Sequence, residues 1–110
     1  MTNALQELLE KIDKHNLSIK DILWIKIALY DDMEHITSSL AINNNNKEIS
    51  TKLTNTLSSF NYDSGYAAIG IQEDSIIMFK DNTWLERNEY DGSEWWEFKS
   101  IPKFKLTKEK

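Results

Sequence analysis

The sequence predicts an α+β fold in which two or three N-terminal helices pack on a four-stranded antiparallel β-meander. Through the first 60 of the 110 residues, apolar side chains recur every three or four positions, which is typical of helices with one buried face. Residues 61–101 instead hold short runs rich in Ile, Trp, Phe and Tyr, separated by pairs of turn-forming residues, as in consecutive hairpins. The length suits one domain, so we expect residues 1–110 to form a single domain that ends in a Lys-rich tail at 102–110.

Three helices are expected in the N-terminal part. The first carries an apolar stripe at the spacing of one helical face, made of Leu5, Leu8, Leu9 and Ile12. A capping box formed by Ser18 and Asp21 predicts the start of a long second helix that runs toward residue 40. Its buried stripe would be Ile22, Ile25, Leu29, Met33, Ile36 and Leu40. A third, shorter helix follows the asparagines at 43–46, with a stripe of Ile49, Leu53, Leu57 and Phe60.

Four strands are expected at residues 66–72, 75–80, 83–90 and 93–100, joined by two-residue turns. Asp91-Gly92 is the strongest of these turn signals. Across it, the register pairs Tyr90 with Ser93, Arg87 with Trp96, Glu86 with Glu97, Leu85 with Phe98 and Trp84 with Lys99. Across Asp81-Asn82, the register pairs Phe79 with Trp84, Met78 with Leu85 and Ile76 with Arg87. Across Glu73-Asp74, it pairs Ile71 with Ile76 and Ile69 with Met78.

Because side chains alternate along a strand, this register sorts the residues by face. The face expected to meet the helices carries Ile69, Ile71, Ile76, Met78, Leu85, Arg87, Trp96 and Phe98. Arg87 is expected to stack its guanidinium on the indole of Trp96. The opposite face is expected to carry Ile77, Phe79, Trp84, Glu86, Asn88, Trp95 and Glu97. A one-residue slip at a turn would exchange the faces of the strands beyond it.

The charge of the chain is concentrated in its C-terminal half. The net charge is −5 overall, yet residues 61–100 alone hold 9 acidic and 3 basic side chains, a net of −6, and three of the four Trp. This balance argues against direct binding to nucleic acid. The chain has no Cys, no apolar run long enough to span a membrane and no visible signal peptide. We therefore expect a cytoplasmic protein with no membrane partner.

The sequence offers little support for catalysis, a metal site or a cofactor. Glu86 and Glu97 face each other in the expected register, and paired carboxylates can perform acid–base chemistry when their pKa values are pushed apart. Solvated carboxylates, or carboxylates that await a basic partner, explain the pair better. The two histidines, His15 and His35, lie in no metal-binding pattern, and no Gly-rich phosphate loop is present. We expect no enzyme activity, no cofactor and no metal.

Recognition of a protein partner fits the C-terminal half better. Aromatic anchors dominate interface hot spots, and carboxylates around them would steer a basic partner into place. The expected contact surface consists of Trp84, Glu86, Glu89, Asp91, Glu94, Trp95 and Glu97. Trp96 is expected in the core. An alternative is that these indoles are all core residues and the carboxylates are simply solvated.

The segment at residues 81–97, DNTWLERNEYDGSEWWE, resembles a hairpin of small phage-encoded or prophage-encoded proteins. The size, acidity and helices-plus-sheet plan are also similar to phage anti-defence proteins such as anti-CRISPR proteins. The resemblance implies a non-enzymatic inhibitor of a larger basic protein, such as a nucleic-acid-binding defence effector, and transfers no residue roles. Two alternatives remain: a toxin-neutralising immunity protein, and a structural homo-oligomer, such as a homodimer, that uses the aromatic sheet face.

Overall fold

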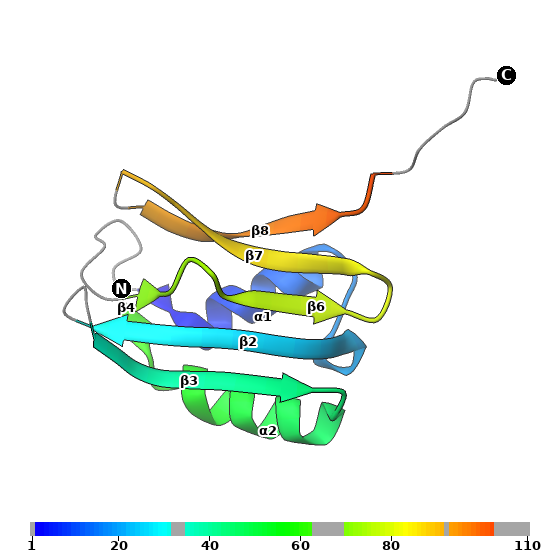
Figure 1. Cartoon of the computed structure of the whole chain (residues 1–110), viewed down its shortest axis with the longest axis horizontal. Helices are drawn as coiled ribbons and strands as arrows, with labels where there is room; N and C mark the ends of the chain where they lie inside the picture. Colours follow the sequence, from blue (N-terminus) through cyan, green and yellow to red (C-terminus); the bar gives the residue numbers. More distant parts are fainter. Residues whose placement is uncertain (1, 32–34, 63–69, 92, 103–110) are drawn as a thin grey trace, which may run out of the picture.

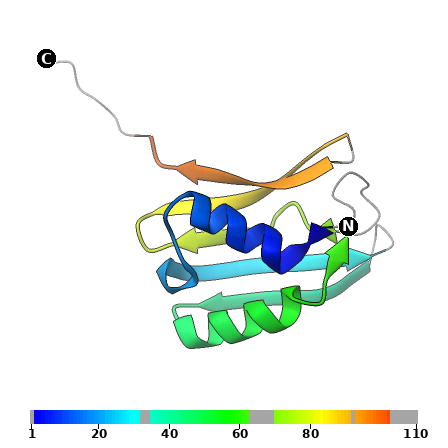
Figure 2. The same ribbon diagram turned by 180° about the vertical axis from the view of Figure 1, so that it is seen from behind.

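A computed structural model describes residues 2–31, 35–62, 70–91 and 93–102. The fold is α+β, with two α-helices on one side of a largely antiparallel six-stranded sheet (Figures 1 and 2). The helices are α1 (Ala4–Lys14) and α2 (Asn46–Leu57). A short 3-10 helix, η1 (Ile19–Asp21), precedes the sheet. The main strands are β2 (Ile22–Asp31), β3 (His35–Asn43), β6 (Ile76–Phe79), β7 (Thr83–Tyr90) and β8 (Ser93–Ser100), in the spatial order β3-β2-β6-β7-β8.

Three short strands complete the fold. β5 (Gly70–Ile71) pairs with β2. It lies in line with β6 along the same side of β2, so the two are halves of one interrupted strand. Between the two halves, the Ser75 hydroxyl accepts a hydrogen bond at 3.1 Å from the backbone N–H of Ala28 on β2. β1 (Thr2–Asn3) and β4 (Asn61–Tyr62) form a separate two-stranded ribbon.

The expected first and third helices are confirmed. The side chain of Asn3 caps α1 by accepting the N–H of Gln6, and the left-handed backbone of Asn16 follows its end. Asn45 caps α2 in the same way, through the N–H of Glu48. Most of the two predicted stripes point inward, since Leu8, Ile12, Ile49, Leu53 and Leu57 are buried. Leu9 is an exception, because it is 39% exposed, and Phe60 lies beyond the end of α2.

The prediction of a long second helix is wrong. The predicted division into a helical part at 1–60 and a sheet at 61–101 is therefore wrong as well. Ser18 and Asp21 do form the capping box, but it starts only η1. The chain then enters an antiparallel pair of strands, β2 and β3. The physical reason is that β2 is rich in β-branched Ile and also alternates with period two: Ile25, Ile27 and Leu29 are buried, whereas the residues between them face the other side.

The register across the last turn is confirmed at every pair, from Tyr90 with Ser93 to Trp84 with Lys99. The register across the preceding turn is wrong by one residue, since Ile77 faces Leu85 and Met78 faces Trp84. Asn82 has a positive φ of 70°, as in three-residue hairpin loops, and the added loop residue causes the slip.

This slip exchanges the two faces of β6. Ile77 and Phe79 are fully buried, and Ile76 and Met78 lie on the side away from the helices. The expected hairpin at Glu73-Asp74 is absent, because β5 and β6 both pair with β2. Ile69 lies outside the described residues.

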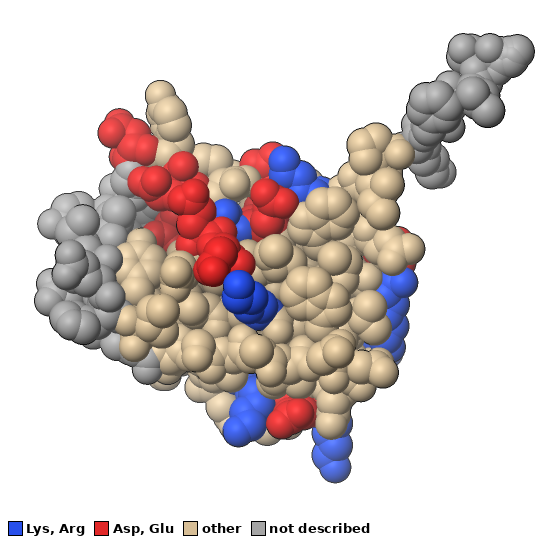
Figure 3. All heavy atoms as spheres, in the orientation of Figure 1, with Lys and Arg blue, Asp and Glu red and all other residues tan. Residues whose placement is uncertain are grey.

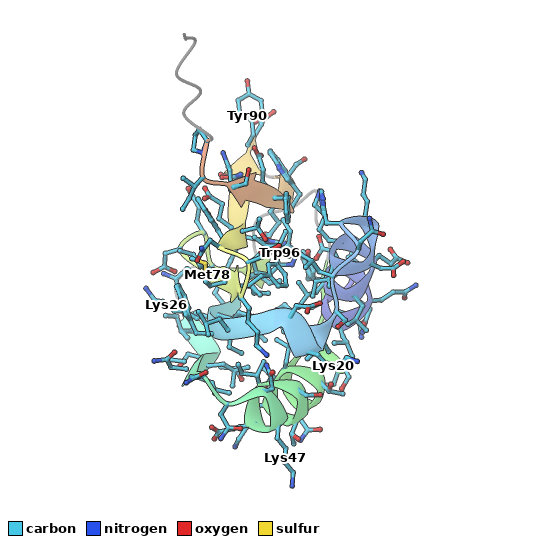
Figure 4. All side chains as sticks on the ribbon, turned by 90° about the vertical axis from the view of Figure 1, so that its right-hand side faces the viewer. Lys20, Lys26, Lys47, Met78, Tyr90 and Trp96 are labelled. Carbon is cyan, nitrogen blue, oxygen red and sulfur yellow. The ribbon has the colours of Figure 1, made fainter. Side chains whose placement is uncertain are left out.

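One apolar core lies between the sheet and the two helices. A continuous row across five strands forms its floor: Ile42, Ile25, Ile77, Leu85 and Phe98. Figure 4, which looks along the sheet, shows Trp96 on the side of α1 and Met78 and Lys26 on the opposite side. The fold therefore leaves one complete sheet face without a covering layer among the described elements.

Candidate functional site

The sheet face opposite the helices, called the open face below, is the strongest candidate site. Its position follows from strand alternation, because every buried side chain of β2, β6, β7 and β8 points toward the helices. The open face carries Trp24, Lys26, Ile76, Met78, Trp84, Glu86, Asn88, Trp95, Glu97 and Lys99. Figure 3 views the molecule from this side and shows a broad uncharged area, with acidic side chains gathered toward the β7–β8 hairpin.

The centre of the open face is a row of large apolar side chains. Trp24 on β2 faces Met78 on β6, and Met78 faces Trp84 on β7. All three are partly exposed, as is Ile76 next to Met78. An apolar strip of this extent, over which no described element lies, is typical of an interaction surface. Beside Trp24, a shallow hollow of about 350 Å³ extends to Ala41 and Asn43.

Four of the expected contact residues form two pairs, each of an indole and a carboxylate. Trp84 Nε1 donates to Glu86 Oε1 at 2.8 Å, and Trp95 Nε1 donates to Glu97 Oε1 at 3.3 Å. Trp95 is 39% exposed, whereas Trp84 is half-buried. Glu86 and Glu97 lie directly opposite each other on neighbouring strands. Two indole–carboxylate pairs therefore stand side by side on this face.

Glu97 is held as an anion. Its carboxylate accepts a hydrogen bond from Trp95 Nε1 and another from Asn88 Nδ2 at 2.9 Å, and it lies 3.4 Å from Lys99 Nζ. These hydrogen bonds, with that of Trp95 the largest, and the Lys99 charge hold the pKa of Glu97 below its ordinary value. A general acid at neutral pH needs a raised pKa. The lowered pKa of Glu97 instead suits recognition of a positive charge.

The tip of the β7–β8 hairpin extends the acidic area. Glu89 and Asp91 are exposed there, and Tyr90 is 77% exposed between them. Asp91 takes a positive φ of 53°, as the turn requires. Glu89 and Asp91 thus lie with their side chains at the surface, next to the open face.

Glu94, the remaining expected contact residue, is not at the surface. It is only 5% exposed, because residues 94, 96 and 98 of β8 share the side that faces α1. We therefore exclude it from the open face. Its carboxylate instead accepts Arg87 Nε at 3.1 Å and Arg87 Nη2 at 2.9 Å.

Arg87 is the centre of a buried ionic network, and its side chain is fully buried. The expected stacking is confirmed: Arg87 Cζ lies 5.1 Å from the ring centre of Trp96, and 5.5 Å from that of Tyr62. Glu7 of α1 lies 3.2 Å from Arg87 Nη1. Burial opposes the charge, but Glu7, Tyr62 and Glu94 outweigh it, so the pKa of Arg87 is raised.

Two tyrosines close the network. The Tyr62 hydroxyl accepts from Arg87 Nη2 and donates to Glu7 Oε1. The Tyr30 hydroxyl donates to Glu94 Oε2 at 3.1 Å, and the N–H of Ile71 donates to Glu94 Oε1 at 3.0 Å. The network therefore joins α1, β2, β4, β5 and the β7–β8 hairpin, and it fixes the hairpin that carries the open-face carboxylates.

We predict that stability falls in alkali because of these tyrosines. Burial, then the charge and hydrogen bond of Glu94, raises the pKa of Tyr30 to about 12, and burial also raises the pKa of Tyr62. In the unfolded chain a tyrosine ionises at about pH 10. The stabilisation is therefore complete below that pH and is lost as the pH rises toward the folded value.

Urea unfolding at about pH 9 and about pH 11 tests this linkage. Tyr30→Phe and Tyr62→Phe should each lower the free energy of unfolding at the lower pH. Between the lower and the higher pH, each variant should lose less of this free energy than the unsubstituted chain. Equal losses in all three proteins would contradict the assignment.

Within the described residues, no helix combines the length and the apolar character needed to cross a membrane. The same residues hold no group of three or more His, Asp or Glu placed to bind a metal ion. Comparison of the chain with protein families, curated proteins and solved structures finds no match in any of the three.

Proposed function

We propose that the chain is a small acidic inhibitor without enzyme activity, which binds a larger basic protein and occludes its working surface. The partner would be a nucleic-acid-binding defence effector of the bacterial cytoplasm. The observation that carries the proposal is the open face, where Trp84 and Trp95 stand beside Glu86 and Glu97 on an uncovered sheet. Glu89 and Asp91 at the hairpin tip complete the surface.

The chemistry of this face fits a partner that binds phosphates. Carboxylates on a rigid sheet can take the positions of phosphate groups, and Arg forms bidentate hydrogen bonds with either. Indoles beside them supply apolar contact area and a surface on which a guanidinium stacks. Arginines of the partner would bind Glu86 and Glu97 and stack on Trp95.

Capture with a variant pair tests the proposal. The chain is immobilised and exposed to a lysate of the organism that carries its gene, and the retained proteins are identified. The test variant is Glu86→Lys with Glu97→Lys. The control, Asp13→Lys with Glu48→Lys, changes the charge equally on two exposed residues of the helices. We expect a basic protein to be retained by the unsubstituted chain and the control, and lost from the test variant.

Trp95→Ala separates the apolar contribution from the charge. We expect it to weaken binding of the captured protein by about 30-fold, the effect of a hot-spot indole. Leu9→Ala on α1 is the matched control, since Leu9 is also 39% exposed. Equal binding by both variants, together with full binding by the double-lysine variant, would remove the open face from consideration. A captured toxin would favour the immunity-protein alternative with the same surface.

A further inference from the structure

The two edges of the sheet differ in how they are protected. Among the described strands, β3 and β8 lie at opposite ends of the order β3-β2-β6-β7-β8. An edge strand presents a row of unpaired backbone N–H and C=O groups, and proteins usually blunt such rows with charges or proline. β8 carries Glu97 and Lys99, and charged residues of α1 line a hollow beside Trp95 and Trp96.

β3 carries neither charge nor proline over most of its length, although its pairing with β2 has one irregularity, between Leu29 and Tyr30. It is nine residues long, and from Ile36 to Asn43 it contains no charged residue and no proline. Ile36 is 57% exposed, and Ser39 and Ala41 are exposed as well. A long, neutral edge with exposed apolar side chains is a template for pairing with another strand.

The hydrogen bonds of the neighbouring strand show which groups of β3 point outward. Asn44 N–H donates to Leu23 C=O at 2.8 Å, which sets the alternation of bonded and non-bonded pairs along β2 and β3. Ala28 confirms it independently, since its backbone groups bond to Ser75 and Gln72 on the other side of β2. Ser39 and Ala41, opposite Ala28 and Lys26, therefore direct their N–H and C=O groups away from the sheet.

We propose that β3 pairs antiparallel with β3 of a second copy of this chain, across a two-fold axis normal to the sheet. Such an axis sets the strand against its own copy, so a charge near the axis would lie close to the same charge of the second chain. β3 meets this condition because it is neutral. The charged edge at β8 stays free, so the assembly closes as a dimer.

The dimer goes beyond the proposed function. A two-fold axis normal to the sheet keeps both open faces on the same side of one continuous sheet. Two sites for a basic partner would then lie on the same side of the joined sheet, one toward each end, which strengthens binding to a partner that repeats its surface at that spacing. The pairing uses none of the residues assigned to partner binding, so the two proposals fail independently.

Sedimentation velocity of the full chain tests the dimer. We expect twice the chain mass at concentrations of about 100 μM. Ser39→Lys with Ala41→Lys puts like charges along the paired edge, and it should weaken the dimer by about tenfold or more. Asn55→Lys with Ser59→Lys, at exposed positions on and just after α2, is the matched control and should leave the dimer intact.

A second measurement does not depend on the lysine variant. The chain has no Cys, so Ser39→Cys with Ala41→Cys introduces thiols only at the proposed contact. Mild oxidation should link two chains, whereas Ser59→Cys should stay unlinked. A monomer at all concentrations, a dimer that survives both lysines at the edge, or a dimer abolished only by Trp84→Ala would overturn the proposal. The last result would assign the contact to the open face.

Discussion

Replacing Arg87 with Met is expected to lower the free energy of unfolding by about 3–5 kcal/mol, since it leaves buried acceptors without their cation. Glu94 is almost fully buried and takes two hydrogen bonds from Arg87. Glu7 and Tyr62 lose the same partner. Equilibrium unfolding in urea, with the midpoint and slope fitted separately, measures the loss.

The matched control is the exposed pair of Lys26 and Asp74. Lys26 Nζ lies 3.3 Å from Asp74 Oδ2, and the two side chains are 60% and 57% exposed. Lys26→Met should therefore lower the free energy of unfolding by less than about 1 kcal/mol. Glu94→Met should restore part of the stability of the Arg87→Met chain, because it removes the uncompensated carboxylate. Equal costs for Arg87→Met and Lys26→Met would show that the network contributes little.

Replacing Gly70 with Ala is expected to destabilise the chain by about 2–3 kcal/mol, because it displaces a buried carboxylate from its donors. A Cβ at this position would overlap the carboxylate of Glu94. A flexible side chain could move aside at little cost, but this carboxylate is held by Arg87, Tyr30 and the N–H of Ile71. Gly70 is therefore required by the close approach of Glu94.

A double-mutant cycle tests this assignment. In a chain that already carries Glu94→Ala, the obstacle is gone, and Gly70→Ala should cost less than about 1 kcal/mol. The same cost in both backgrounds would mean that Gly70 acts through the backbone and not through Glu94.

The parts of the fold that local signals determine could be predicted from the sequence. The caps and stripes predicted α1 and α2, and the Asp91-Gly92 turn predicted the whole register of the last hairpin. β2 and β3 were missed because their apolar spacing fits both a helix and a strand. Long-range pairing with β6 decides between the two, and no local pattern reports it. The period-two run of Ile25, Ile27 and Leu29 was the available signal.

The candidate site was predicted in part for the same reason. Trp84, Glu86, Trp95 and Glu97 lie together on one face, as the hairpin register predicted. The charge of Glu94 favours a place at the surface, whereas its parity with Trp96 favours burial. The strand alternation alone would have placed it inside. Its partners Tyr30 and Ile71 come from elements distant in sequence, so only the fold reveals them.

The binding affinity of the captured basic protein for the Glu86→Lys with Glu97→Lys variant tests the central claim most directly. Reversing the charges of Glu86 and Glu97, which face each other on the open face, should weaken binding by about 100-fold or more. The control, Asp13→Lys with Glu48→Lys, should stay within about threefold of the unsubstituted chain. Equal weakening by the two variants would mean that net charge alone governs binding, and it would contradict a specific role for the open face.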